Sequence, residues 1–165
     1  EHKQIDTLKS FWLFDTFTDA ELYLFLPYLY HRTFRKNEVI FYREDPAQSI
    51  YLIESGEVKI YLELHESEED LMHLKTNDTF GENAVFENSR RNYSAVALSD
   101  KANIIMIPQV CLQGIFDKSP ALKGKLFYNT AHNYYDFTRK LVQTYTHDLG
   151  FFEIRSIFEN DRKND

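Results

Sequence analysis

Residues 80–95 read Phe-Gly-Glu-Asn-Ala-Val-Phe-Glu-Asn-Ser-Arg-Arg-Asn-Tyr-Ser-Ala. Gly81 has no Cβ, so the main chain there can approach a ligand closely. If a short helix begins at Glu82–Ala84, its free N–H groups and positive end point at an anion. Arg91 follows Glu82 by nine positions and supplies a planar counter-charge that takes two oxygens at once. The stretch therefore predicts an anion-binding loop.

The residues on both sides of this loop have the pattern of short β-strands. Val58, Ile60, Leu62 and Leu64 alternate with polar residues, as in a half-buried strand. Turn signals stand at Ser55–Gly56, Asn77–Asp78 and Ser99–Asp100, and we interpret the acidic run Glu66–Asp70 as a solvated hairpin tip. The predicted strands are 38–42, 49–53, 57–64, 71–74, 93–98 and 102–107. Many short strands between such turns favour a β-roll over about 31–108.

Helical patterns flank the predicted roll. Thr18 or Asp19 can cap a helix that Pro27 should kink or end. After Pro108 we predict a short helix over 110–118 and a long one over 120–147, begun by a proline and ended by Gly150. Residues 151–158 read as one or two further helical turns. The predicted fold class is mainly β with flanking helices (α+β), an antiparallel, jelly-roll-like double-stranded β-helix with one N-terminal and two C-terminal helices.

Length and composition narrow the functional classes. The 165 residues, 43% of them hydrophobic, favour one domain over 1–150 with C-terminal helices over 109–148, followed by a tail over 151–165. A net charge of −7 argues against general affinity for nucleic acid or anionic membrane, and no apolar run is long enough to span a bilayer. Cys111 is the single cysteine, with buried packing as the default, and it suits a reducing, cytoplasmic compartment.

Catalytic patterns are missing from the sequence. The six histidines have no ligand spacing on a common face, and no nucleophile–base or paired-carboxylate arrangement is defensible from spacing. We therefore expect neither a metal nor a cofactor, and no enzymatic activity.

The stretch 80–95 resembles the phosphate-binding cassette of the cyclic nucleotide-binding domain family, whose pattern is Phe-Gly-Glu, a short helix and an arginine. Residues 50–61 are similar to the family's most recognisable hairpin, and 34–41 look like its first strand pair. The resemblance covers roughly 13–141. It implies a regulatory domain that binds cyclic AMP or cyclic GMP and moves its C-terminal helices when it does so.

The resemblance also implies roles for single residues. Glu82 would accept a hydrogen bond from the ribose 2′-hydroxyl, and Asn92 matches a position that touches the phosphate. Ile60 and Met72 stand where the family packs the purine. The ligand-binding positions implied are Phe80, Gly81, Glu82, Asn83, Ala84, Arg91, Asn92, Ile60 and Met72.

Several positions depart from the family pattern. Asn83 replaces a leucine or isoleucine, Arg90 replaces a proline, and Asn92 and Tyr93 replace small residues. Tyr93 either crowds the cassette or faces the core. Asn37 and Asn77 replace turn glycines, which is a mild change because asparagine tolerates a left-handed backbone.

The residues leave alternatives open. Glu82 and Arg91 can also form a structural ion pair across an empty pocket, and Arg90 becomes the phosphate ligand if the loop shifts by one residue. The whole domain can also be a scaffold that kept the fold and lost the ligand. The helix over 120–147, with Phe127, Tyr134 and Phe137 on one face, can form a homodimer or contact an attached effector domain.

Overall fold

The structure is a computed structural model that describes residues 2–145, and the chain divides into two compact units between Asn129 and Thr130. Gly150, the last two residues of the predicted long helix and the predicted tail 151–165 lie outside the described residues. The first unit begins with helical elements: α1 (His2–Lys9), η1 (Trp12–Phe14), α2 (Asp19–Tyr23) and η2 (Leu26–Tyr28). It also holds α3 (Gln109–Lys118) and the start of α4 (Pro120–Tyr145).

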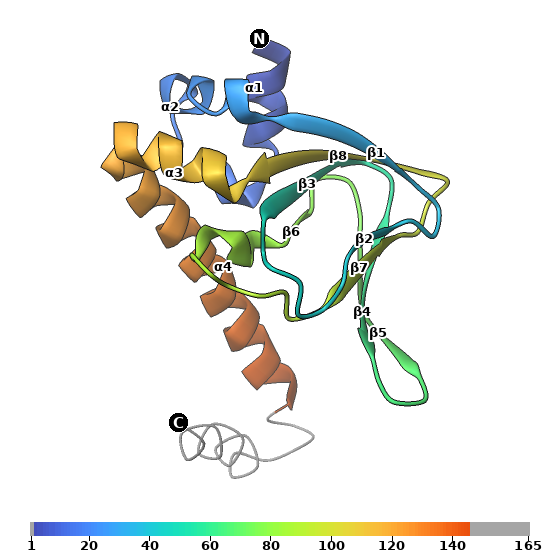
Figure 1. The fold of residues 1–165 in the computed structure, drawn as a ribbon. Coiled ribbons are helices and arrows are strands. Elements are labelled where there is room, and N and C mark those ends of the chain that lie inside the picture. The colour runs from blue at the N-terminus through green and yellow to red at the C-terminus, as the bar shows by residue number, and fades with distance from the viewer. Residues whose placement is uncertain (1, 146–165) are drawn as a thin grey trace. The chain divides into compact units, whose positions relative to one another are not determined.

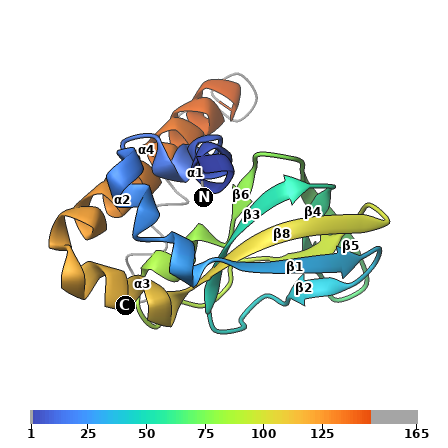
Figure 2. The same ribbon diagram turned by 90° about the horizontal axis from the view of Figure 1, so that it is seen from above.

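Eight strands form two four-stranded antiparallel sheets in the order β1-β8-β3-β6 and β2-β7-β4-β5. Figure 2 shows β1, β8 and β3 side by side, with α1, α2 and α3 at one end of the roll. The β4–β5 hairpin projects from the opposite end (Figure 1). The strands are β1 (Tyr30–Arg35), β2 (Val39–Phe41), β3 (Ser49–Ser55), β4 (Val58–Glu63), β5 (Glu68–Leu74), β6 (Thr79–Phe80), β7 (Ser94–Ala97) and β8 (Lys101–Pro108).

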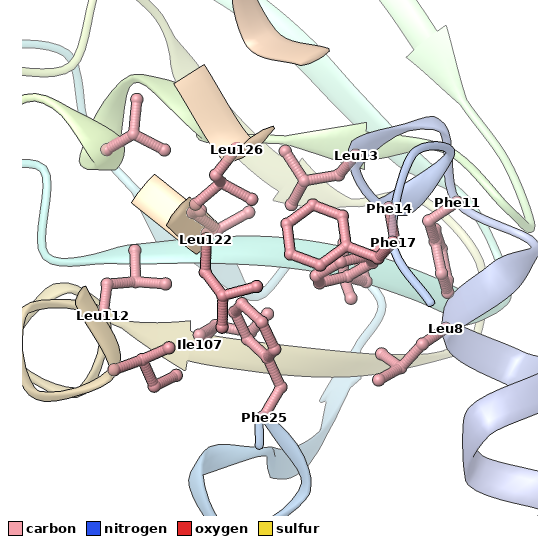
Figure 3. Packing of buried hydrophobic residues seen from close by; sticks show 14 of the residues in the cluster. Leu8, Phe11, Leu13, Phe14, Phe17, Phe25, Ile107, Leu112, Leu122 and Leu126 are labelled. Carbon is pink, nitrogen blue, oxygen red and sulfur yellow. The ribbon is translucent and has the colours of Figure 1, made fainter. Parts of the chain in front are cut away.

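Strand β3 separates two hydrophobic cores because successive side chains of a strand point to opposite faces. Ile50 and Leu52 pack with the helices, whereas Tyr51 and Ile53 point into the roll. This explains why five consecutive residues of β3 are buried. In the helical core, Leu122 and Leu126 of α4 pack with residues of the N-terminal segment and of β8 (Figure 3). The cassette, residues 80–95, contributes side chains to both cores, so it is held between them.

The predicted fold class is confirmed, with four local corrections. The N-terminal region has two α-helices where the sequence predicted one; α1 was missed because only Ile5 and Leu8 are buried in it. Residues 34–41 do not form a strand pair, because β1 pairs with β8 and β2 with β7. The acidic run is not only a hairpin tip, because β5 begins at Glu68. There, Lys59 pairs with the carboxylates of Glu68 at 2.6 Å and of Asp70 at 3.2 Å. Finally, Cys111 is only partly buried.

The two asparagines at turns behave as expected. Asn37 has φ 66° and Asn77 has φ 72°, both in the left-handed region. A short polar side chain tolerates this backbone better than most residues do. The same holds for Asn88 at φ 58°, whereas Glu44 at φ 70° has no sequence signal of this kind.

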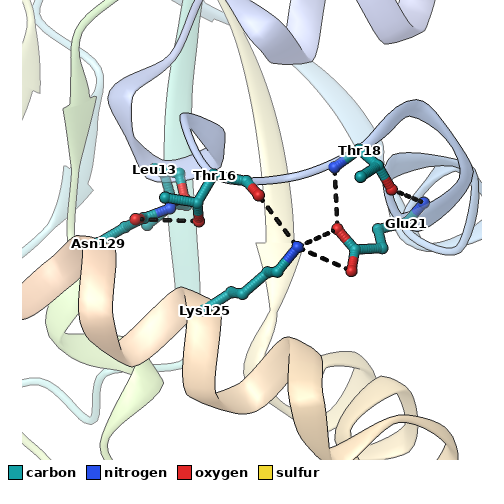
Figure 4. A network of polar contacts seen from close by, with 6 residues as sticks. All are labelled: Leu13, Thr16, Thr18, Glu21, Lys125 and Asn129. Atoms are coloured by element: carbon teal, nitrogen blue, oxygen red, sulfur yellow. Dashed lines mark hydrogen bonds and ion pairs between the residues drawn. The ribbon is translucent and has the colours of Figure 1, made fainter.

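The start of α4 is attached to the N-terminal segment by a polar network (Figure 4). The Lys125 ammonium donates to both carboxylate oxygens of Glu21, at 2.9 and 2.7 Å, and to the Thr16 carbonyl at 3.1 Å. One turn later the Asn129 amide donates to the Leu13 carbonyl at 2.9 Å. These contacts join two segments that are about a hundred residues apart in the chain.

Replacing Glu21 with alanine should lower the free energy of unfolding by about 1–2 kcal/mol, because it removes together the ion pair and the bond of the capping box that the Thr18 N–H donates to the Glu21 carboxylate. Glu21→Gln keeps the cap and should cost less. The hydrogen bond from Lys125 is the first cause that lowers the Glu21 pKa from its ordinary value of 4.5. This stabilisation is therefore present above about pH 4.5 and lost as the pH falls through the lowered pKa. Denaturant unfolding at pH 7 and pH 3 measures both effects; equal costs for the two variants would exclude the cap.

Candidate functional site

The cassette begins with a left-handed residue between β6 and a single helical turn. Gly81 has φ 66° and precedes η3 (Glu82–Val85), the short helix that the sequence predicted to begin at Glu82–Ala84. The Ala84 N–H donates to the Gly81 carbonyl at 3.1 Å. Because η3 has only four residues and uses this N–H internally, its dipole is a minor source of attraction for an anion. The attraction for an anion therefore depends mainly on Arg91.

The backbone of Arg91 is fixed by the loop that follows β2. Its N–H donates to the Asp45 carbonyl at 2.9 Å, and its carbonyl accepts from the Glu44 N–H at 2.9 Å. Next to these bonds, Pro46 and Arg90 form an isolated antiparallel bridge. The side chain of Arg91 then points inward and is only 2% exposed. Arginine is almost never this buried without partners, so its contacts identify what the site is built around.

The Arg91 guanidinium donates hydrogen bonds to three neutral groups. Its Nη1 donates to the Gly81 carbonyl at 2.8 Å and to Asn83 Oδ1 at 3.0 Å, and its Nη2 donates to the Ser49 carbonyl at 2.5 Å. Its Cζ lies 4.2 Å from the ring centroid of Phe41, in a cation–π contact. Burial lowers the Arg91 pKa from its usual value. Within the described residues Nε has no hydrogen-bond partner. The guanidinium is thus a buried cation with unused hydrogen-bonding capacity.

Tyr93 both packs in the core of the roll and occupies the cassette, the two alternatives that the sequence left open. Its ring packs against Phe41 at 5.7 Å between centroids, so it belongs to the core of the roll. Its hydroxyl accepts a hydrogen bond from the Gly81 N–H at 3.0 Å, so it also occupies the cassette. Burial raises the pKa of this hydroxyl far above its ordinary value, which keeps it neutral.

Asn83 connects the two ends of the cassette. Its Nδ2 donates to the Arg90 carbonyl at 2.8 Å, which leaves Oδ1 to face Arg91. Its own carbonyl accepts from the Ser89 hydroxyl at 2.7 Å. A leucine or isoleucine at this position would make none of the side-chain bonds.

The other predicted cassette residues surround this centre. Ala84 and Phe80 are buried, and Phe80 stacks on Tyr51 at 5.0 Å. Glu82 is half-buried, and its charge acts on both Arg91 and Tyr93. The three hydrogen bonds of the guanidinium named above go to other residues, and a structural ion pair between Glu82 and Arg91 stays an alternative. Asn92 is exposed.

Arg90, the alternative phosphate ligand, faces away from the roll interior. Its side chain is exposed, and Nη1 donates to the Glu44 carbonyl at 2.7 Å. The shifted alignment that would exchange Arg90 for Arg91 is therefore wrong for this structure. The two neighbouring arginines instead form a natural pair of test and control positions.

The predicted purine contacts lie opposite each other on β4 and β5. Ile60 pairs with Met72, and the next pair on the same face, Val58 and Leu74, is buried in the core of the roll. Ile60 is 5% exposed and Met72 46% exposed. The pair Ile60 and Met72 therefore presents a partly exposed apolar surface next to the buried pair Val58 and Leu74.

Three contributors to the site were not predicted from the sequence. Phe41 and Tyr51 place their rings on Arg91, and Ser49 contributes a main-chain carbonyl. The alternation of β3 could have identified Tyr51 as facing the roll interior. A carbonyl acceptor has no signature, because every residue carries one.

The cassette is also connected to the helices that follow the roll. Gln109, the first residue of α3, donates from Nε2 to the Ala84 and Phe86 carbonyls, each at 3.0 Å. The Phe86 ring packs edge-on against Phe127 of α4 at 5.5 Å. Both contacts lie within the first unit, so a movement of η3 acts directly on two helices.

The part of the chain that the structure describes offers no metal site and no membrane-spanning helix. No group of three or more histidine, cysteine, aspartate or glutamate side chains there is placed to hold a metal ion. None of the helices described over 2–145 has the length and hydropathy required to cross a membrane.

Comparison with known proteins agrees with this geometry. A family model described as "Cyclic nucleotide-binding domain" matches residues 31–119. The chain is 34% identical over 89 residues to the cyclic AMP receptor protein of Thermus thermophilus, covering 53% of this chain and 41% of that protein. It is 37% identical over 67 residues to a cAMP-dependent protein kinase regulatory subunit of Hypocrea atroviridis, covering 41% of this chain and 14% of that one. Each match thus spans less than half of the relative's length.

Solved structures show the same likeness. The catabolite activator protein of Thermus thermophilus superposes with a TM-score of 0.67 and 25% identity, over 81% of this chain and 62% of that chain. A structure titled "cAMP bound PfPKA-R (141-441)" superposes with a TM-score of 0.60 and 28% identity, over 67% of this chain and 39% of that one.

Proposed function

The chain belongs to the cyclic nucleotide-binding domain family, and from this premise we propose that it is a non-catalytic regulatory module whose roll binds cyclic AMP or cyclic GMP. The observation that carries the proposal is Arg91, a buried cation that donates hydrogen bonds to three neutral groups and whose Nε has no hydrogen-bond partner among the described residues. A cation is costly to bury unless it is compensated. The charge of a cyclic phosphate would add to the compensation that the Glu82 carboxylate gives.

The remaining parts of a nucleotide have matching surfaces. The Glu82 carboxylate, at the start of η3, is in the cassette beside Arg91 and would accept a hydrogen bond from a ribose hydroxyl. Asn92 would add a polar contact next to the phosphate. Ile60 and the exposed Met72 would pack against the flat face of a purine. These assignments choose no purine, so cyclic AMP and cyclic GMP remain equal candidates.

Transmission of binding would run through η3. A ligand that changes the position of η3 would pull on Gln109 and shift Phe86 against Phe127. A ligand shifts such an equilibrium only by the difference in its affinity for the two states. The output would be a change at α3 and α4, to which an effector domain or a second copy would respond. The exposed Tyr135 and Phe137 of α4 are available for such a partner.

Titration of the purified protein with each cyclic nucleotide is the direct test. At a hundredfold excess over its dissociation constant, a ligand should stabilise the folded state by about 2.7 kcal/mol. We expect a concentration-dependent rise in melting temperature with at least one of the two nucleotides and none with the matching 5′-monophosphate, whose extra charge the single cation does not balance. No shift at millimolar concentration would overturn the proposal.

A specific observation favours a second candidate, a scaffold domain without a ligand. Tyr93 fills part of the cassette, and Asn83 already accepts a hydrogen bond from Arg91. Under this alternative the site is closed by the protein itself, and neither nucleotide binds. The titration distinguishes the two functions.

A further inference from the structure

Two oxygens of the protein occupy the donors that a ligand would use. Asn83 Oδ1 accepts from Nη1 of Arg91 at 3.0 Å, and the Tyr93 hydroxyl accepts from the Gly81 N–H at 3.0 Å. The donors are the cation of the site and the first main-chain amide of the cassette loop. Both acceptors come from positions at which the sequence departs from the family pattern.

Both acceptors are held firmly in place. The Asn83 amide cannot simply rotate away, because its Nδ2 is bound to the Arg90 carbonyl at 2.8 Å. The Tyr93 ring is packed against Phe41, which itself lies 4.2 Å from the Cζ of Arg91. A ligand oxygen that reaches either donor must therefore displace an ordered side chain.

We infer that Asn83 and Tyr93 are built-in stand-ins for ligand oxygens, which close the anion site in the empty protein and thereby set how much ligand is needed to open it. This inference rests on the proposed function. An empty state stabilised by such contacts lowers the apparent affinity in proportion to the population of the open state. The contact of a stand-in oxygen with its donor exists only in the empty state, so the loss of that oxygen should tighten ligand binding. In Asn83→Leu we expect this gain to exceed the loss of the Nδ2 bond to the Arg90 carbonyl.

The central test is a pair of substitutions at one position with opposite expected effects. Asn83→Leu removes the oxygen and restores the side chain typical of the family; the affinity for cyclic nucleotide should rise about tenfold. Asn83→Asp places a carboxylate beside Arg91 that competes with the phosphate; the affinity should fall at least about tenfold. An Asn83 that only supported the loop would weaken binding in both variants.

Tyr93→Phe tests the second stand-in and keeps the ring. It removes the acceptor of the Gly81 N–H, and we expect affinity to rise about threefold to tenfold. Tyr30→Phe is the matched control, because Tyr30 is 54% exposed on β1. It should leave the affinity unchanged.

Calorimetric titration with cyclic AMP and cyclic GMP provides the affinities, and the NMR signal of the Arg91 Nε–H reports a change at the guanidinium itself. Tighter binding by Asn83→Leu and weaker binding by Asn83→Asp support the inference. Binding by Asn83→Leu where the unaltered protein binds nothing supports it too, although the sensor function then fails. Equal or weaker binding by Asn83→Leu than by the unaltered protein overturns the inference and leaves the proposed function standing. Absence of binding in every variant overturns both.

Discussion

Replacing Arg91 with alanine should reduce the affinity for cyclic nucleotide by at least about 100-fold. A hydrogen bond to a charged group contributes about 1.5–3 kcal/mol, and a guanidinium facing a phosphate makes two of them. The adjacent Arg90 is no substitute, because its side chain is exposed and donates to the Glu44 carbonyl. Calorimetric titration of the variant measures the loss.

The adjacent arginine is the control for charge and for position in the chain. Arg90→Ala removes the same charge from an exposed side chain, so the affinity should change by no more than about twofold. If both variants lose binding equally, the effect is general electrostatics and Arg91 has no special role.

Stability must be measured beside affinity, because Arg91 also packs the roll. Its removal takes the Arg91 donors away from the Ser49 carbonyl and from the Gly81 carbonyl, which keeps the Ala84 N–H, and it leaves a cavity beside Phe41. We expect a cost of about 2–4 kcal/mol of unfolding free energy. Arg91→Lys keeps the charge and loses the planar fork, so a folded variant with intermediate affinity remains available.

The predictions from the sequence were best where the physical cause is local. The cassette was located by the resemblance of residues 80–95 to the family pattern, in which a short helix and an arginine follow Phe-Gly-Glu, and the short helix is where that pattern implies it. The left-handed conformations of Asn37 and Asn77 were predictable because they depend only on the residue's own backbone.

The predictions that failed concern contacts between residues that are distant in the chain. The acceptor of Arg91 Nη2 is a carbonyl 42 residues away, and a carbonyl has no sequence signal. The extension of β5 into the acidic run depends on Lys59, which lies across the hairpin and pairs with Glu68 and Asp70. Strand pairing itself is a long-range property, so adjacent strands such as β1 and β2 were wrongly joined.

Gly81→Ala should lower the free energy of unfolding by about 2–4 kcal/mol, because strain and overpacking add at this position. At φ 66° an L-residue is already strained. The added Cβ would stand 2.6 Å from Nη1 of Arg91 and 3.0 Å from a ring carbon of Tyr51. A flexible side chain at the surface would move aside at little cost, but the side chain of Arg91 is only 2% exposed. It is held by hydrogen bonds to Ser49 and Asn83.

Gly114 is the matched control for this glycine substitution. It lies in α3 with no atom within 4 Å of the added Cβ, so Gly114→Ala should stabilise the protein by up to about 1 kcal/mol. Denaturant unfolding of both variants measures the difference, and its sign should be opposite in the two. If the free energy of unfolding of Gly81→Ala lies within about 0.5 kcal/mol of that of the unaltered protein, the Arg91 side chain moves aside at little cost. The cation would then not be the fixed centre of this site, and the proposals built on its position would fall with it.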